Sequence, residues 1–338
     1  MTLSYTFLKC NLVSFKHSKI FINFKGVVYQ MDKKAYFFID DTIWVFRDIA
    51  REKPASIFDN AFMKMLKKTH DDNGLTVQLN LFYRTDFFYG NDEFTLAEMP
   101  DTYKEEFEAS TDWLRLAFHA KQEFPDYPYV NATYEDVKEN YERIINEIKR
   151  FAGEGSIANA VIPHWLPISK EGCRALADCG VKFLSPSAGP RKEFTGDDSV
   201  LPYGHAARLR QNRQPETMLY SRGGKNKAID SSICAYNHLE QDVFDSIVWK
   251  NKSILDEETG IRFKQLGGGP CLNLNSLDDI AERLAQLNGS EYIGTATHEQ
   301  YFYPDYYAYQ PDYPEKVYLL SKILKEYGYR FITADKME

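Results

Sequence analysis

The chain has 338 residues, of which 43% are hydrophobic and 15% aromatic. This composition is typical of a folded globular protein and excludes a disordered or fibrous one. Its 49 Asp and Glu outnumber its 41 Lys and Arg, which gives a net charge of −8. We therefore expect no nucleic-acid and no membrane partner, because binding to phosphates requires a concentrated basic face. The sequence leaves the oligomeric state open.

The cysteines and the N-terminal segment indicate the compartment. None of the five cysteines forms a CxxC pair, which predicts free thiols in a reducing compartment: they are Cys10, Cys173, Cys179, Cys234 and Cys271. No apolar stretch approaches the roughly 20 residues that cross a bilayer. Lysines interrupt every apolar run of residues 1–30, and no small-residue cleavage site follows. We expect a cytoplasmic protein in which residues 1–30 are a leader or a loose arm, with Met31 as an alternative start.

From Lys34 onward, short apolar runs alternate with segments of helical periodicity, as in parallel strands joined by helices. The predicted strands are 35–39, 75–83, 113–118, 157–162, 181–184, 292–297 and 329–333. The predicted helices are 56–68, 102–110, 133–151, 170–179, 276–287 and 314–327. The segment 186–272 is rich in Gly, Arg and Asn and breaks this rhythm. We predict a single α/β domain over 31–338, a deformed (β/α)7 barrel with 186–272 as an insertion after strand five.

Several acidic and histidine side chains follow the predicted strands directly. Asp40 and Asp41 follow strand one, His119 strand three, His164 strand four and His298 strand six. In β/α barrels the catalytic groups lie at these carboxyl ends of the strands. Each residue alone has an ordinary structural explanation, such as a helix cap or a core histidine. Their shared position predicts that they meet at one rim.

Two neighbouring patterns add further candidate residues to this rim. If the chain is helical after His119, the i, i+4 spacing brings Glu123 beside the imidazole, as a divalent metal requires. Trp165 follows His164, and Tyr301 and Tyr303 lie in an unusually aromatic loop. These three rings are candidate substrate contacts that stack on sugars. The alternative is that they pack over the barrel as structural residues.

The run Phe37-Phe38-Ile39-Asp40-Asp41 resembles the first motif of the polysaccharide deacetylases (NodB homology, carbohydrate esterase family 4), where an aromatic-rich strand ends in Asp-Asp. His119 resembles the first histidine of that group's His-x-x-x-His metal motif, and His298 resembles its late histidine. The similarity spans roughly residues 34–333. It implies a deformed seven-stranded barrel and a metal-dependent hydrolase that removes an acyl group from an N-acetylated sugar or a similar amide, at a carbon–nitrogen bond other than a peptide bond.

The same resemblance implies roles for individual residues. Asp40 would be the general base, Asp41 and His119 metal ligands, and His298 the general acid. The metal would be zinc, with cobalt, manganese or nickel as alternatives. The chain departs from the family at Glu123, which replaces the second histidine of the metal motif, and around His164, where the family's Arg-containing motif is not recognisable. The third ligand is therefore either Glu123 or His164.

Two other functions remain open at this stage. The first is a non-catalytic carbohydrate-binding relative with an incomplete metal site, which the two departures favour. The second is a metal-independent glycosidase, in which Glu299 or Glu123 would pair with Asp40 as acid and nucleophile.

Overall fold

The computed structural model describes residues 32–85, 93–124, 128–130, 132–186, 236–237, 239, 241–248, 252–306 and 308–337. It also describes the backbone of two short antiparallel strands, β1 (Phe21–Ile22) and β2 (Val28–Tyr29). Apart from these two strands, the predicted leader lies outside the described residues, as does most of the predicted insertion. No helix within the described ranges is long and apolar enough to cross a membrane.

Apart from the antiparallel pair β1 and β2, the described strands form two sheets that are almost entirely parallel. In the first, the order is β10 (Tyr292–His298), β3 (Lys34–Thr42), β4 (Val77–Phe82) and β5 (Leu114–Ala120), and β11 (Arg330–Phe331) pairs with the start of β3. In the second, the order is β6 (Ala160–Val161), β7 (Phe183–Leu184), β9 (Arg262–Lys264) and β8 (Ser253–Leu255), of which only β8 is antiparallel. The predicted α/β architecture with a parallel central sheet is confirmed.

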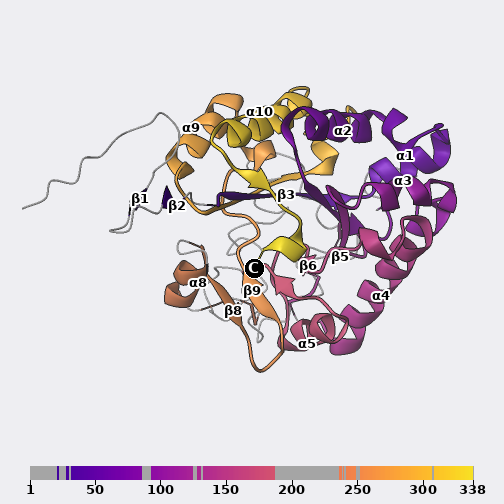
Figure 1. Ribbon diagram of the computed structural model, residues 1–338. Coiled ribbons are helices and arrows are strands. Elements are labelled where there is room, and N and C mark those ends of the chain that lie inside the picture. The colour runs from indigo at the N-terminus through magenta and orange to yellow at the C-terminus, as the bar shows by residue number, and fades with distance from the viewer. Residues whose placement is uncertain are drawn as a thin grey trace, which may run out of the picture.

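Helices alternate with these strands and surround them (Figure 1). They are α1 (Trp44–Glu52), α2 (Ala61–Asn73), α3 (Lys104–Ala109), α4 (Tyr134–Phe151), α5 (Lys170–Asp178), α8 (Gln241–Val248), α9 (Leu277–Leu287) and α10 (Tyr313–Glu326). Thr133 and Ser276 begin α4 and α9 with capping boxes, which explains why the sequence located both helices. The sequence did not predict α1, which follows β3 after one residue.

Isolated bridges connect the two sheets into a ring. Leu116 of β5 pairs in parallel with Ile157 just before β6, and Cys271, downstream of β9, pairs in parallel with Ala296 of β10. Among the described residues, seven parallel strands follow one another around this ring. One of them, β9, lies inside the predicted insertion: residues 261–264 look strand-like in the sequence, but so short a piece flanked by irregular chain gives no sign that it belongs to the barrel. The last predicted strand, β11, instead pairs only with the start of β3.

Alternation along β3 separates two hydrophobic cores. Phe37 and Ile39 belong to the large core that includes the apolar faces of the helices. Tyr36 and Phe38 face the opposite side, in a smaller core shared with β6, β7 and the C-terminal segment. Ile332 from that segment packs in the smaller core as well. The smaller core therefore lies inside the ring of strands, directly below the carboxyl end of β3.

Candidate metal centre

An irregularity at the end of β3 turns two consecutive aspartates toward the same place. Asp40 continues the inward face of the strand, whereas strict alternation would turn Asp41 outward. Between Ile39 and Thr42 the pairing with β4 shifts by one residue, so β3 carries a bulge, and Asp41 there has a φ of +61°. Aspartate tolerates this left-handed conformation better than most residues. The bulge brings both carboxylates to the mouth of the ring.

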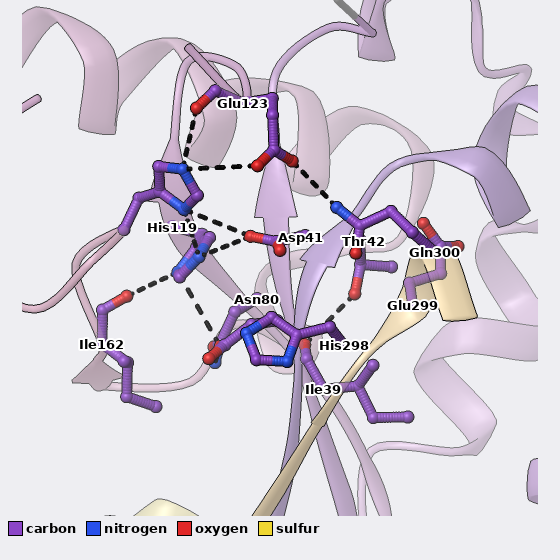
Figure 2. Close-up of polar contacts among 12 residues, drawn as sticks. Ile39, Asp41, Thr42, Asn80, His119, Glu123, Ile162, His298, Glu299 and Gln300 are labelled. Atoms are coloured by element: carbon purple, nitrogen blue, oxygen red, sulfur yellow. Dashed lines mark hydrogen bonds and ion pairs between the residues drawn. The ribbon is translucent and has the colours of Figure 1, made fainter. Parts of the chain in front are cut away.

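Asp41 meets two histidines from neighbouring strand ends. Its Oδ1 lies 3.0 Å from Nε2 of His119 at the end of β5, and 3.2 Å from Nδ1 of His164, which follows β6. The two imidazole nitrogens are 3.2 Å apart, so the three atoms form a nearly equilateral triangle. All three side chains are buried. Figure 2 shows the side chains of Asp41 and His119 directed at each other.

The outer nitrogens of both imidazoles are occupied by backbone carbonyl groups. Nδ1 of His119 lies 2.6 Å from the carbonyl oxygen of Ile162 (Figure 2). Nε2 of His164 lies 2.8 Å from the carbonyl oxygen of Glu123. A carbonyl only accepts, so each of these nitrogens carries the proton. In the neutral imidazoles the lone pairs of Nε2 of His119 and Nδ1 of His164 then face Asp41, which is the arrangement in which histidine binds metals.

These residues fit a divalent cation. One carboxylate oxygen and two imidazole nitrogens are the donor set of many zinc sites and of related transition metals. Bonds of about 2.0–2.2 Å separate adjacent ligand atoms by roughly 3 to 3.5 Å, which agrees with the triangle. Among the described residues, Asp41, His119 and His164 are the group of acidic, cysteine and histidine side chains whose ligand atoms lie close enough together to hold a metal.

The electrostatics separate the roles of the two aspartates. Burial by itself would raise the pKa of Asp41, but when the imidazoles are protonated the hydrogen bonds from His119 and His164, with the charges of His164 and His298, outweigh it and hold this pKa well below the usual 3.8. For Asp40, burial dominates and raises the pKa to about 6, although the nearby His119 opposes the shift. Asp41 therefore stays ionised, whereas Asp40 is prepared to take up a proton near neutral pH.

A chain of buried amides orients Asp40. Asn80 of β4 donates from Nδ2 to Oδ1 of Asp40 at 2.6 Å. Gln78 donates from Nε2 to the side-chain oxygen of Asn80 at 2.7 Å and to the carbonyl of Ala160 at 3.0 Å, and it accepts from the hydroxyl of Tyr36. The hydrogen bonds from Tyr36 through Gln78 and Asn80 all run toward Asp40, which fixes the position of its carboxylate and favours its charged form.

His298 lies beside this group at the end of β10, in register with Asp40. Its charge contributes to the low pKa of Asp41, so the two side chains are electrostatically linked. Nδ1 of His298 lies 3.0 Å from Oδ1 of Asn273, which fixes the plane of the ring. With Nδ1 donating to Asn273, Nε2 is the atom through which His298 can exchange a proton.

Glu123 does not take the position that the sequence predicted. His119 ends a strand and residues 121–123 form bends, so no helix places Glu123 beside it. The register of β5 with β4 carries the extended chain as far as Ala120, and it overrides the i, i+4 pattern. The carboxylate of Glu123 instead accepts from Nε2 of Gln300 at 2.9 Å and lies 4.0 Å from Nε2 of His164 (Figure 2).

Glu299 is fully buried and engaged with the backbone. Its Oε2 accepts from the amides of Ile43 at 2.7 Å and Trp44 at 2.8 Å, and its Oε1 accepts from Val45 at 2.7 Å. Burial raises the pKa of Glu299 to about 7, although these three hydrogen bonds oppose the shift. Because both oxygens are used at the first turn of α1, this carboxylate is not placed to act as the acid or nucleophile of a glycosidase.

The three aromatic candidates lie in different surroundings. The ring of Trp165 lies 5.8 Å from His164, and that of Tyr301 lies 6.2 Å from His298, so both border the centre. Tyr303 instead packs against Trp44 at 5.0 Å, although both tyrosines belong to the large core. We expect a structural role for Tyr303, while Trp165 and Tyr301 stay candidates for contacts with a substrate.

Sequence reasoning missed several polar partners of the centre. Gln78 and Asn80 alternate with valine and leucines along β4, so the strand has a polar face that turns inward. That alternation was a usable signal for a polar barrel mouth. Asn273 and Gln300 carry no such signal, because their partners, His298 and Glu123, come from distant or irregular segments.

Comparisons with known proteins bear on the fold of the chain. Protein-family profiles and curated proteins gave no match. Among solved structures, a 4-alpha-glucanotransferase from Thermococcus litoralis is 11% identical and superposes with a TM-score of 0.50, over 91% of this chain and 40% of that one. The likeness is one of fold. The chain spans less than half the length of that enzyme.

Carbohydrate esterases of family 4 are also among the structural neighbours. The Xyl-CE4 domain of a multidomain xylanase from the hindgut metagenome of Trinervitermes trinervoides is 12% identical, over 90% of this chain and 89% of that one, with a TM-score of 0.38. A family 4 acetyl xylan esterase from Clostridium thermocellum, solved with a cobalt ion, is 10% identical, over 90% of both chains, also with a TM-score of 0.38.

Proposed function

We propose that this chain is a metal-dependent hydrolase that removes an acyl group from an N-acetylated sugar or a similar small amide. The observation that carries the proposal is the convergence of Asp41, His119 and His164 on one point, with the imidazole lone pairs facing the carboxylate. Asp41 and the two histidines would hold the ion. A divalent cation there polarises an acyl carbonyl and makes a water molecule more acidic.

The residues around the ligands supply proton transfer. Asp40 lies next to the ligands, with its Oδ1 3.8 Å from Nδ1 of His119, and its raised pKa suits a general base that takes a proton from water. His298 lies at the adjacent strand end and presents Nε2, because Asn273 holds Nδ1. Protonated His298 would donate to the departing amine nitrogen, so that the two proton transfers occur at separate side chains.

The alternative functions receive less support from the site. The ligand group contains three members without Glu123, so the substitution at that position does not leave the donor set incomplete. A glycosidase that relies on paired carboxylates would need Glu299 or Glu123 beside Asp40. Glu299 is held by three backbone amides, and Glu123 accepts from Gln300.

Metal content and substrate cleavage test the proposal together. We expect the purified protein to bind about one zinc, cobalt or manganese ion per chain, and to release acetate from N-acetylated amino-sugar oligomers. A chelator should stop the reaction, and added metal should restore it. O-acetylated xylan serves as the ester comparison, and aryl glycosides serve as the glycosidase comparison.

The outcomes separate the three functions. Acetate release that survives complete removal of metal would contradict the proposal. Cleavage of aryl glycosides in the presence of a chelator would favour the glycosidase. Protein that binds no stoichiometric metal, and gains no thermal stability when zinc, cobalt or manganese is added, would favour the non-catalytic relative.

A further inference from the structure

Glu299 connects the ligand-bearing corner of β3 to the end of β10. The corner comprises residues 40–45, from the two aspartates to the first turn of α1, and Glu299 binds three successive amides in it. The carboxylate has no exposed surface, and the two segments are more than 250 residues apart in sequence. Burying a carboxylate is costly unless it is fully hydrogen-bonded, so its presence here calls for an explanation beyond ordinary packing.

The held amides begin two residues after Asp41, whose left-handed backbone aims its carboxylate at the histidines. Within the bulge itself, the hydroxyl of Thr42 donates to the backbone carbonyl oxygen of Ile39 at 3.2 Å, which ties together the two ends of the segment that holds both aspartates. Asp41 is therefore fixed from both directions along the chain. His298 and Gln300, which flank Glu299, contact other parts of the same centre.

We propose that Glu299 is a positioning residue that holds the Asp41 corner in the geometry needed to bind a metal ion. This inference rests on the proposed metal centre and assigns to it a residue that contacts none of the three ligand side chains in the structure. Substitutions of groups that orient metal ligands weaken metal affinity by about 10- to 100-fold. We expect an effect of that size when a substitution removes a carboxylate oxygen of Glu299 that accepts these hydrogen bonds.

A helix cap offers the competing explanation, because Glu299 also satisfies the first amides of α1. The chain contains a matched control for this reading. Asn60 is buried and caps α2 by accepting from the amides of Phe62 at 3.0 Å and Met63 at 3.3 Å. Asn60→Ala removes a comparable cap from a helix that carries no metal ligand.

The experiment compares Glu299→Gln, Thr42→Val and Asn60→Ala with the parental full-length chain. Gln keeps the shape of Glu but places an NH2 group against backbone N–H donors. Zinc affinity is measured by competition with a chromophoric chelator, the visible absorption spectrum is recorded with cobalt bound, and the melting temperature is recorded without metal. We expect at least tenfold weaker zinc binding and an altered cobalt spectrum for Glu299→Gln, with parental values for Asn60→Ala.

Each result bears on a different claim. Parental zinc affinity and cobalt spectrum in Glu299→Gln, whatever its melting temperature, would overturn the positioning role and leave the proposed function standing. If Glu299→Gln does not fold, Thr42→Val decides, since it removes one hydroxyl at the same bulge and should also weaken zinc binding. A parental chain that binds no metal would overturn the proposed function and this inference together.

Discussion

The two halves of the centre are built differently. The ligand half comes from the ends of β3 and β5 and the segment after β6, where Asp41, His119 and His164 are buried and backbone carbonyls hold the two imidazoles. The β10 half carries His298, which is only half-buried and is oriented by the side chain of Asn273, next to Leu274 with 58% exposure. For the proposed hydrolase, this difference favours a rigid place for the ion beside a more open place for the substrate.

Substitutions of the two adjacent aspartates should break the ligand half in different ways. Asp41→Ala removes a ligand and should abolish stoichiometric metal binding. Asp40→Asn keeps the shape and should retain the metal while kcat falls by about 10²- to 10⁴-fold, because the base is lost. Metal analysis and steady-state kinetics of both variants test this. Equal metal loss in the two would contradict the division of roles.

Two substitutions test whether His164 or Glu123 is the third metal ligand, a choice that the sequence left open. His164→Ala should reduce metal affinity by several orders of magnitude, because Nδ1 belongs to the ligand triangle. Glu123→Gln should change it by no more than about 10-fold, because His164 is held by the backbone carbonyl of Glu123, which the substitution preserves. Titration of zinc by competition with a chelator measures both. Larger loss in Glu123→Gln would make Glu123 the ligand.

A substitution in the β10 half should change turnover without changing metal affinity. Asn273→Leu removes the acceptor for Nδ1 of His298, a hydrogen bond worth about 1 kcal/mol. We expect kcat to fall about fivefold to tenfold, with unchanged metal affinity, and the basic limb of the pH profile to shift. Unchanged kcat and pH profile would show that Asn273 does not orient His298.

The metal-free protein should lose stability as pH rises toward neutrality. Burial raises the pKa of Asp40 from 3.8 to about 6 and that of Glu299 from 4.5 to about 7. Burial would lower the pKa of His119, but the carboxylates of Asp40 and Asp41 outweigh it and raise this pKa above 6.5. All three groups hold protons more tightly when folded, so the free energy of unfolding falls between about pH 4 and pH 7.

The depressed pKa of Asp41 acts in the other direction, but its contribution is lost only at pH values below this window. Thermal denaturation in the presence of a chelator, from pH 4 to pH 8, measures the trend. Added zinc should stabilise the protein most at the higher pH values, because histidine must be deprotonated to bind it. A melting temperature of the metal-free protein that rises steadily from pH 5 to pH 7 would contradict these shifts.

The sequence was sufficient for those parts of the molecule that depend on local patterns. Short apolar runs located β3, β4 and β5, and capping boxes located α4 and α9. Because the carboxyl ends of parallel strands lie at the same edge, the positions of Asp41, His119 and His164 after their strands placed all three at one rim. The bulge that turns Asp41 inward was not predictable, since it depends on the register between β3 and β4.

Other features depend on contacts between distant segments. The short strand β9 was placed in an insertion, because a strand-like piece of a few residues in irregular chain does not show that it pairs with β7. The hydrogen bonds of Glu299 join residues more than 250 positions apart, and the sequence offered for Glu299 only an alternative role as acid or nucleophile of a glycosidase. The choice between Glu123 and His164 depended on where the chain bends after β5, which no local pattern specified.

The most direct test of the central claim is a crystal structure of the zinc-bound protein with anomalous data at the zinc edge. We expect one strong peak within about 2.0–2.3 Å of Oδ1 of Asp41, Nε2 of His119 and Nδ1 of His164. Clear zinc density elsewhere in the crystal with none at this triangle, or an ion held by Glu123 in place of His164, would contradict the account.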